Sequence, residues 1–244
     1  MAFAIVGHRG AMAEAPENTI ASYRVAEEVG VDELETDVRI SSDGQLFMLH
    51  DATLDRVAAE PAGKDLGPVA ELTWSEISSV DVGGGERVPT LEQMYQATTR
   101  LVQLEIKDLA AIDGLAGFFL RHPGYAERTI LTGFSVEAMA TVAEKLPEIP
   151  RGIIVSKWTT AESHPGGYRK LIEDTGSCRI HSGAEGLTAE VVRQLHDEGF
   201  PVHGWPTRDE DDLRYWLELG VDGTTSDDPR TARRWLAEAL PRTG

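Results

Sequence analysis

Charged residues close two strand-like runs of the sequence, in each case two positions apart. Glu35 and Asp37 lie in the run 31–38, and Glu105 and Lys107 follow the apolar residues 101–104. Because side chains alternate between the two faces of a strand, each pair projects to one side. A buried charge needs a partner or a reaction to compensate its lost hydration. The two runs therefore predict neighbouring strands that direct charge into one pocket.

Three of these carboxylates form a candidate metal site. Glu35, Asp37 and Glu105 offer hard oxygen ligands, which suit one divalent cation, Mg²⁺ or Ca²⁺ or else Mn²⁺, better than a softer metal. The alternative is a structural ion-pair network with Arg9 and Lys107. Three acidic side chains at the ends of adjacent strands favour metal ligation over that network.

Two histidines are expected at the same pocket, although they follow different segments of the chain. His8 and Arg9 follow the first apolar run, whereas His50 follows a turn at 42–44 and an extended return at 45–49. Imidazoles titrate near neutral pH, so His8 and His50 are a candidate acid–base pair. Arg9, through its planar fork, and Lys107, as a point charge, are candidate contacts for phosphate oxygens. A single histidine is more often structural, but the expected convergence of the two favours catalysis.

Short apolar runs alternate with amphipathic stretches of helical spacing, as a parallel sheet with crossover helices requires. The predicted strands end near residues 7, 38, 106, 132, 155, 181, 205 and 225. The predicted helices cover about 19–29, 91–99, 110–121, 135–146, 166–174, 188–198, 209–219 and 229–240. Eight strand–helix units in a chain of about 250 residues indicate an α/β fold, a single (β/α)8 TIM barrel, with its site at the carboxyl ends of the strands.

One stretch interrupts this alternation. Residues 52–90 are rich in proline and glycine around a short amphipathic piece at 74–80. We interpret them as a small insertion in the loop after the second strand, on the face where loops build the site. Glycines 83–85 lack the Lys-Ser/Thr partner of a phosphate-binding loop and are interpreted as a flexible loop. No linker or repeat divides the chain, so residues 1–244 are predicted to form one domain.

Composition restricts the partners. The chain has 244 residues, 41% apolar content and a formal charge of −18. This charge opposes binding to a nucleic-acid backbone or an anionic membrane surface, so we expect no nucleic acid and no stable membrane association. No stretch approaches the roughly 20 apolar residues of a membrane span, and the run 1–6 is interpreted as the first strand rather than a signal peptide. We expect a cytoplasmic monomer or homodimer.

The single Cys178 excludes an intrachain disulfide and is expected to be buried.

A series of short motifs, in this order, resembles one enzyme family over nearly the whole chain. The motifs are His8-Arg9-Gly10, Pro16-Glu17-Asn18-Thr19, Glu35-x-Asp37, Asp43-Gly44, His50-Asp51, Pro89-Thr90-Leu91, Glu105-x-Lys107 and Gly220-Val221-Asp222-Gly223. Together they resemble the glycerophosphodiester phosphodiesterase family. The resemblance implies a (β/α)8 barrel that hydrolyses glycerophosphodiesters to sn-glycerol 3-phosphate and an alcohol with a divalent cation. The chain would then be a phosphoric diester hydrolase with a small-molecule phosphodiester substrate.

The resemblance also implies a role for each residue of the predicted pocket. The corresponding residues are the catalytic His8 and His50, the metal ligands Glu35, Asp37 and Glu105, and the phosphate contacts Arg9 and Lys107. Residues 16–19 would orient the first loop and cap its helix.

Three positions depart from the family pattern. Gly133-Phe134 replaces Ser-Phe, Trp205-Pro206 replaces Trp-Thr, and Ser226-Asp227 replaces Thr-Asp. None is expected to touch the metal ligands or the histidines. Phe134 and Trp205 are predicted substrate-binding residues, as apolar walls on the alcohol side of the pocket, with ordinary core packing as the alternative. Three further residues at predicted strand ends are candidates either for substrate contacts or for capping: Lys157, Trp158 and His181.

The predicted mechanism uses both histidines. One deprotonates the glycerol 2-hydroxyl, which attacks phosphorus to give a cyclic phosphate, while the other protonates the leaving alcohol. The roles then reverse as water opens the ring. Two alternatives keep the barrel: phospholipase-D-like cleavage of lysophospholipids or sphingomyelin, and a noncatalytic binding protein.

Overall fold

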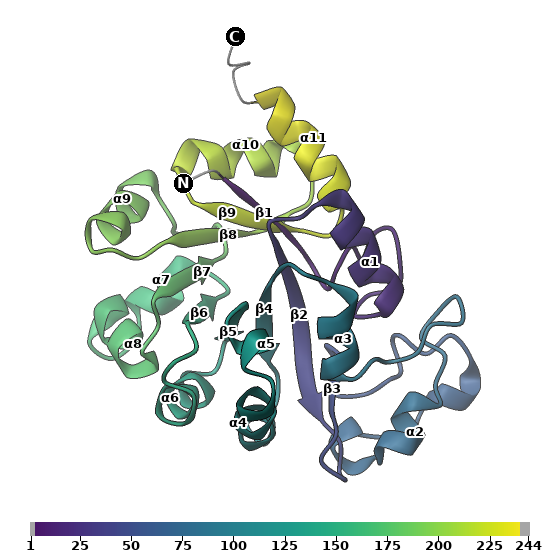
Figure 1. Ribbon diagram of the computed structural model, residues 1–244. Helices are drawn as coiled ribbons and strands as arrows, with labels where there is room; N and C mark the ends of the chain where they lie inside the picture. The colour runs from purple at the N-terminus through teal and green to yellow at the C-terminus, as the bar shows by residue number, and fades with distance from the viewer. Residues whose placement is uncertain (1–2, 240–244) are drawn as a thin grey trace.

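Eight parallel strands close into a barrel in the computed structural model, which describes residues 3–239 (Figure 1). The strands are β1 (Ala4–Gly7), β2 (Glu33–Ile40), β4 (Leu101–Ile106), β5 (Thr129–Gly133), β6 (Arg151–Val155), β7 (Arg179–Ser182), β8 (Val202–Thr207) and β9 (Gly223–Ser226). They neighbour one another in the order β1, β9, β8, β7, β6, β5, β4, β2, and the pairing of β1 with β2 closes the ring. The predicted (β/α)8 fold is confirmed. Met1, Ala2 and Leu240, which the sequence assigns to the first strand and the last helix, lie outside the described residues.

Helices surround the barrel in chain order and agree with the predicted ranges to within two residues at each end. They are α1 (Ile20–Val29), α3 (Leu91–Ala97), α4 (Ala111–Arg121), α6 (Val136–Lys145), α8 (Gly167–Thr175), α9 (Ala189–Asp197), α10 (Glu210–Leu219) and α11 (Pro229–Ala239). The side chains of Thr19, Ser135 and Thr188 accept backbone N–H bonds at the starts of α1, α6 and α9. Left-handed Gly30 and Gly220 end α1 and α10, so local capping explains these boundaries.

A hairpin extends the second strand beyond its predicted end. β3 (Leu46–Met48) pairs antiparallel with β2, with Val38 opposite Met48 and Ile40 opposite Leu46. This pairing carries β2 to Ile40 and confirms the extended return that precedes His50. Two short helices, α5 (Pro123–Ala126) and α7 (Trp158–Glu162), were not predicted, because four or five residues are too few to show a helical period.

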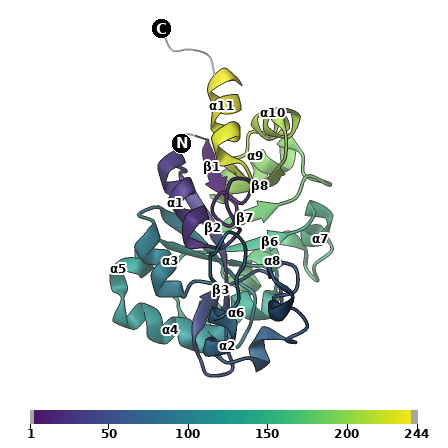
Figure 2. The same cartoon turned by 90° about the vertical axis from the view of Figure 1, so that its right-hand side faces the viewer.

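The insertion occupies the connection from β3 to α3 and packs at the edge of the molecule beside β3 (Figure 2). It contains the 3-10 turns η1 (Pro61–Gly63) and η2 (Val69–Glu71) and the helix α2 (Trp74–Ser78). An apolar cluster of its own, which includes Phe47, Leu54, Val69 and Ile77, attaches it to the hairpin. Apolar burial therefore holds the insertion in place, independently of the polar residues that it directs toward the barrel.

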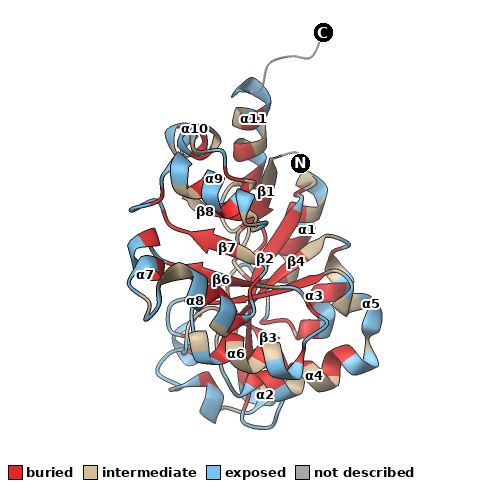
Figure 3. Cartoon of the chain, turned by 90° about the vertical axis from the view of Figure 1, so that its left-hand side faces the viewer, coloured by how far each residue is buried: buried red, intermediate tan, exposed pale blue. Residues whose placement is uncertain are grey.

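Buried residues concentrate in the strands and on the inward faces of the helices (Figure 3). The interior of the barrel is polar toward the amino ends of its strands, where Glu33 Oε2 accepts a bond from Arg179 Nη1 at 2.7 Å and from Gln103 Nε2 at 2.5 Å. His203 Nδ1 lies 3.4 Å from the same Gln103 amide nitrogen. Since each buried charge has a partner, this network fills the barrel beneath the site without an uncompensated ion.

The structure bears on two expectations from composition, one about membrane-spanning helices and one about Cys178. Among residues 3–239, none of the helices combines the length and apolar character that crossing a membrane requires. The prediction that Cys178 is buried is wrong. Cys178 is exposed at the start of β7, where its thiol donates to the carbonyl of Arg151 at 3.3 Å.

Candidate active site

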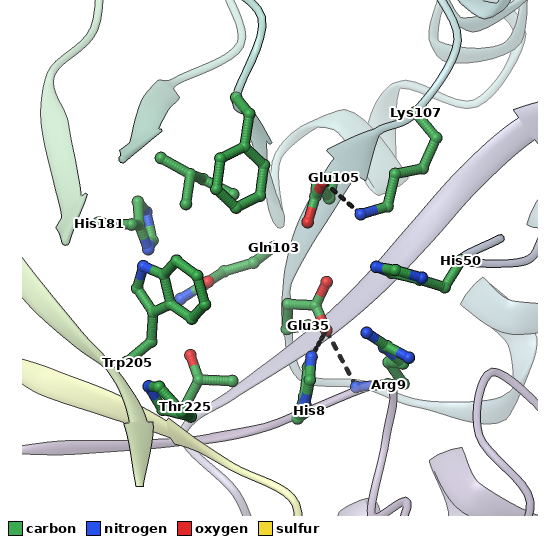
Figure 4. A pocket seen from close by; sticks show the side chains of 13 residues that line it. His8, Arg9, Glu35, His50, Gln103, Glu105, Lys107, His181, Trp205 and Thr225 are labelled. Carbon is green, nitrogen blue, oxygen red and sulfur yellow. Dashed lines mark hydrogen bonds and ion pairs between the residues drawn. The ribbon is translucent and has the colours of Figure 1, made fainter. Parts of the chain in front are cut away.

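A pocket with a volume of about 130 Å³ opens at the carboxyl ends of the barrel strands. Nine of its lining residues were singled out from the sequence: His8, Arg9, Glu35, His50, Glu105, Lys107, Phe134, His181 and Trp205. Figure 4 shows the charged side chains facing one another across one half of this pocket, with Trp205 and His181 in the other half. The strand ends that the sequence predicted to converge therefore do so.

Three buried carboxylates lie together on the charged side. Glu35, Asp37 and Glu105 each offer an oxygen within 4.8 Å of the other two. Burial and the charge of Asp37 raise the pKa of Glu35 to about 8, against a smaller opposing effect of His8. Burial and Asp37 also raise the pKa of Glu105. The cluster thus carries more negative charge than its surroundings compensate.

Two cations and one amide contact the central carboxylate. Lys107 Nζ lies 3.1 Å from Asp37 Oδ1 and 2.5 Å from Glu105 Oε1, and Arg9 Nε lies 3.5 Å from Asp37 Oδ2. Asn18 Nδ2 donates to Asp37 Oδ2 at 2.8 Å. Burial opposes ionisation of Asp37, but Lys107 and Arg9 outweigh it and hold its pKa below the usual value. Asp37 is therefore the ionised centre of the cluster.

The cluster fits a hard divalent cation. Its donors are all carboxylate oxygens, which such cations prefer. Burial and the charge of Asp37 raise the pKa values of both Glu35 and Glu105, although Lys107 Nζ lies 3.1 Å from Asp37 Oδ1. A cation bound by Glu35, Asp37 and Glu105 would compensate this excess of negative charge.

A tight turn brings His8 and Arg9 onto the end of β1. Arg9 has a left-handed backbone with φ 48°, and its N–H donates to Glu35 Oε2 at 3.0 Å. Gly10 follows with φ 91°, and a Cβ there would lie 2.2 Å from Ser22 Oγ. Only glycine fits so close an approach, which accounts for the order His-Arg-Gly.

Each histidine is oriented by a carboxylate. His8 Nδ1 donates to Asp227 Oδ1 at 2.5 Å, and its Nε2 lies 3.9 Å from Glu35 Oε2. His50 Nδ1 donates to Asp51 Oδ1 at 2.6 Å. Because an ionised carboxylate only accepts hydrogen bonds, Nδ1 carries the proton in both rings and Nε2 is left for the pocket.

The surroundings shift the two imidazoles in opposite directions. Burial lowers the pKa of His8, but the bond to Asp227 and the charge of Glu35 raise it by more, so that the net shift is upward. Burial, together with the charges of Lys107 and Arg9, lowers the pKa of His50 by more than Asp37 and Asp51 raise it. A pair with separated pKa values can hold one proton between its members, as acid–base catalysis requires.

The other side of the pocket is aromatic and uncharged. Phe134 and Trp205 meet edge to face with their ring centroids 5.8 Å apart, and His181 is buried without a partner for Nε2. Burial and the neighbouring His203 lower the pKa of His181 well below its usual value. Of the other candidates at strand ends, Trp158 is buried in the outer core and Lys157 pairs with Glu185 at 3.2 Å, so neither lines this pocket.

Several residues that support the site carried no predicted role. Asp51 had a local signal, since it follows His50, whereas Asp227 lies 219 positions from His8. The expectation that Ser226-Asp227 lies away from the histidines is wrong, because Asp227 is the partner of His8. Arg56 also lacked a role, and Asn18, expected to orient the first loop or cap its helix, was not expected to bind Asp37. Long-range pairings of this kind leave no trace in residue spacing.

Comparison with known proteins gives one consistent family. The model of the Glycerophosphoryl diester phosphodiesterase family matches residues 8–231. A glycerophosphodiester phosphodiesterase of Caldanaerobacter subterraneus is 27% identical over 93% of this chain and 95% of its own length. One from Bacillus altitudinis is 26% identical over 93% and 96%.

Comparison with solved structures gives the same family and the same fold. A Silicibacter pomeroyi protein has a TM-score of 0.86 at 25% identity and covers 97% of this chain and 94% of its own. A glycerophosphodiester phosphodiesterase of Agrobacterium tumefaciens has a TM-score of 0.73 at 28% identity over 96% and 100%. An Oleispira antarctica phosphodiesterase, solved with the product sn-glycerol-3-phosphate, has a TM-score of 0.82 at 23% identity over 96% of both chains. The names of these relatives and the family match confirm the predicted enzyme class, a phosphoric diester hydrolase. The chain belongs to the glycerophosphoryl diester phosphodiesterase family.

Proposed function

We propose that this enzyme hydrolyses glycerophosphodiesters to sn-glycerol 3-phosphate and an alcohol, with a divalent cation and with His8 and His50 as its acid–base pair. One observation carries the proposal: two carboxylate-oriented histidines line the same pocket as Glu35 and Glu105, which form a cluster of three buried carboxylates with Asp37 behind them. The product named for the Oleispira antarctica phosphodiesterase is the one expected here.

The histidines supply the proton transfers. The Nε2 atom of one accepts the proton of the glycerol 2-hydroxyl as that oxygen attacks phosphorus, and the Nε2–H of the other donates to the departing alcohol oxygen. A cyclic phosphate results, and the same two groups exchange roles when water opens it. Asp51 and Asp227 hold the rings in the required tautomer throughout.

Arg9 and Lys107 bind the phosphodiester. Both side chains line the pocket, and both already contact Asp37, so each cation is fixed before a substrate arrives. The guanidinium of Arg9 matches two phosphoryl oxygens, and the ammonium of Lys107 adds a point charge. A cation held by Glu35, Asp37 and Glu105 would stabilise charge that develops on the phosphoryl oxygens.

Phe134 and Trp205 complete the substrate pocket as its apolar walls. Phe134 is 46% exposed at the pocket mouth, where a leaving alcohol of variable size has room. This placement favours a wall of the substrate pocket over ordinary core packing.

The test measures release of sn-glycerol 3-phosphate from glycerophosphocholine and glycerophosphoethanolamine, with EDTA, Mg²⁺, Ca²⁺ or Mn²⁺. Cation-dependent release is expected, together with no turnover of a 2-deoxy analogue, since that analogue lacks the attacking hydroxyl. Equal cleavage of the 2-deoxy analogue would contradict the cyclic intermediate. A parallel reaction with lysophosphatidylcholine tests the alternative activity, cleavage of lysophospholipids. Faster cleavage of lysophosphatidylcholine than of the glycerophosphodiesters would favour that alternative.

A further inference from the structure

Arg56 joins two separate parts of the site. It lies on the insertion, and its Nε donates to Asp51 Oδ2 at 2.6 Å. Its two terminal nitrogens donate to the two carboxylate oxygens of Glu17 at 2.6 and 2.7 Å. One planar guanidinium is thus hydrogen-bonded along two edges to two different carboxylates.

Each of these carboxylates holds a residue of the proposed reaction. The other oxygen of Asp51 orients His50 at 2.6 Å, and Glu17 Oε1 accepts from Arg9 NH1 at 2.9 Å. A chain of short bonds therefore runs from His50 through Asp51, Arg56 and Glu17 to Arg9. It connects the hairpin loop after β3 to the loop after β1.

We propose that Arg56 is a positioning residue. By binding Asp51 and Glu17 at the same time, it fixes the positions of His50 and Arg9 relative to each other. The inference rests on the proposed function, in which His50 transfers protons and Arg9 binds phosphate. It also assigns a role to the insertion: its side chain fixes the catalytic geometry, while its apolar cluster, with Phe47, Leu54 and Ile77, anchors it.

Charge and exposure separate this role from a purely structural one. The Arg56 side chain is 48% exposed, whereas that of Glu17 is 10% exposed, so the guanidinium caps carboxylates that lie deeper than itself. Arg9 Nη1 also donates to Glu17 Oε1 at 2.9 Å, so the buried Glu17 keeps a cationic partner when Arg56 is replaced. Loss of Arg56 should therefore disturb the positions of His50 and Arg9 more than the stability of the fold.

The experiment compares Arg56→Ala and Arg56→Lys with wild type, with release of sn-glycerol 3-phosphate as the assay. Arg169→Ala is the matched control, because Arg169 is also an exposed arginine bound to both oxygens of one carboxylate, that of Glu198 on the outer helices. Arg56→Ala is expected to lower kcat/KM by about 10–100-fold, the usual range for a group that orients another. Arg56→Lys should recover little of the loss, since one ammonium cannot bond both carboxylates along two edges. Arg169→Ala should retain wild-type activity.

Chemical rescue distinguishes positioning from packing. Added guanidinium ion, at concentrations that leave the wild-type enzyme unchanged, should restore part of kcat to Arg56→Ala, because the side chain reaches solvent. It should not affect Arg169→Ala. In a double mutant, Arg56→Ala and Asp51→Asn should cost less together than the product of their separate losses, since both interrupt the same chain.

The outcomes are separable. If wild type releases no sn-glycerol 3-phosphate, the proposed function fails. If wild type is active and Arg56→Ala or Arg56→Lys matches it, the role of Arg56 is refuted. A loss that tracks a fall in melting temperature, without rescue by guanidinium, would also refute it. Should Arg56→Ala not fold, Arg56→Lys and Arg56→Gln carry the same comparison.

Discussion

The two sides of the pocket differ in charge: one is lined by charged side chains and the other by aromatic and uncharged ones. On the side built by β1, β2 and β4, charged groups lie in contact with one another, and Lys107 and Arg9 share Asp37. On the side built by β5, β7 and β8, His181 has no bond to Nε2, and Phe134 meets Trp205 through their rings. Under the proposed function, bond breaking belongs to the first side, whereas the second provides an uncharged wall for the substrate.

Substitution of one histidine on each side should give the largest contrast. His50→Ala removes a proton carrier and is expected to lower kcat by about 10²–10⁴-fold, the usual contribution of general acid–base catalysis. His181→Ala removes a neutral wall residue, so its loss in kcat should stay below about tenfold. Steady-state kinetics on glycerophosphocholine measures both. Equal losses would break the division of the pocket into two sides.

Cation binding should belong entirely to the charged side. A cation at 100 times its dissociation constant adds about 2.7 kcal/mol to the free energy of unfolding. Glu35→Gln should abolish this gain, because it removes a ligand. It should leave the cation-free protein at least as stable, since burial and Asp37 raise the pKa of Glu35 to about 8 and disfavour its charge. Urea denaturation with EDTA and with Mn²⁺ measures both effects.

The control for the cation experiment lies on the other side of the pocket. Trp205→Phe keeps the three carboxylates and should keep the full gain from Mn²⁺. A gain that survives in Glu35→Gln, or disappears in Trp205→Phe, would place the cation elsewhere.

Sequence reasoning was strongest where chemistry follows the strand period. Glu35, Asp37 and Glu105 were found because period-two spacing forces them to one face, and the barrel followed from repeated strand–helix units. The helix limits agreed because caps such as Thr19 and Gly30 are local. Local rules therefore predicted the architecture and the charged side of the pocket.

The rest depended on contacts that no spacing encodes. Asp227 reaches His8 from the opposite end of the chain, and Arg56 reaches Glu17 across 39 positions. Cys178 was expected to be buried because cysteine usually is, but its place just before β7 leaves it exposed. His181 was left undecided because its neutrality follows from burial beside His203, which only the closed barrel shows.

Acid should lower the stability of the protein because His203, buried in the barrel below the aromatic side of the pocket, is held uncharged. Burial and Arg179 lower the pKa of His203 to about 3, from an ordinary value of 6.5. Between these values the unfolded chain binds a proton that the folded chain does not, so stability falls as pH falls. From pH 7 to 5 His203 alone should cost about 2 kcal/mol. Urea denaturation at both values should show a smaller fall in His203→Gln than in wild type.

A matched histidine outside the barrel controls this measurement. His122→Gln makes the same replacement between α4 and α5, away from the strands, and its pH dependence is compared with that of His203→Gln. An unchanged pH dependence in His203→Gln would mean that the barrel interior tolerates an imidazolium, and the distinction between a charged and a neutral side would lose its physical basis.

The smallest effect concerns the aromatic wall. Phe134 is 46% exposed and meets Trp205 at one edge, so Phe134→Ala removes a limited apolar surface from the pocket mouth. We expect KM for glycerophosphocholine to rise by less than about tenfold, which corresponds to less than about 1.4 kcal/mol, with kcat nearly unchanged. Leu120→Ala, at an 84% exposed position on α4, is the control and should change neither constant. A fall in kcat without a change in KM would show that the ring acts on the reacting phosphate rather than on the alcohol, because only a contact made in the transition state lowers kcat alone. In that case the aromatic side would share in the chemistry, and the contrast between the two sides would be one of degree.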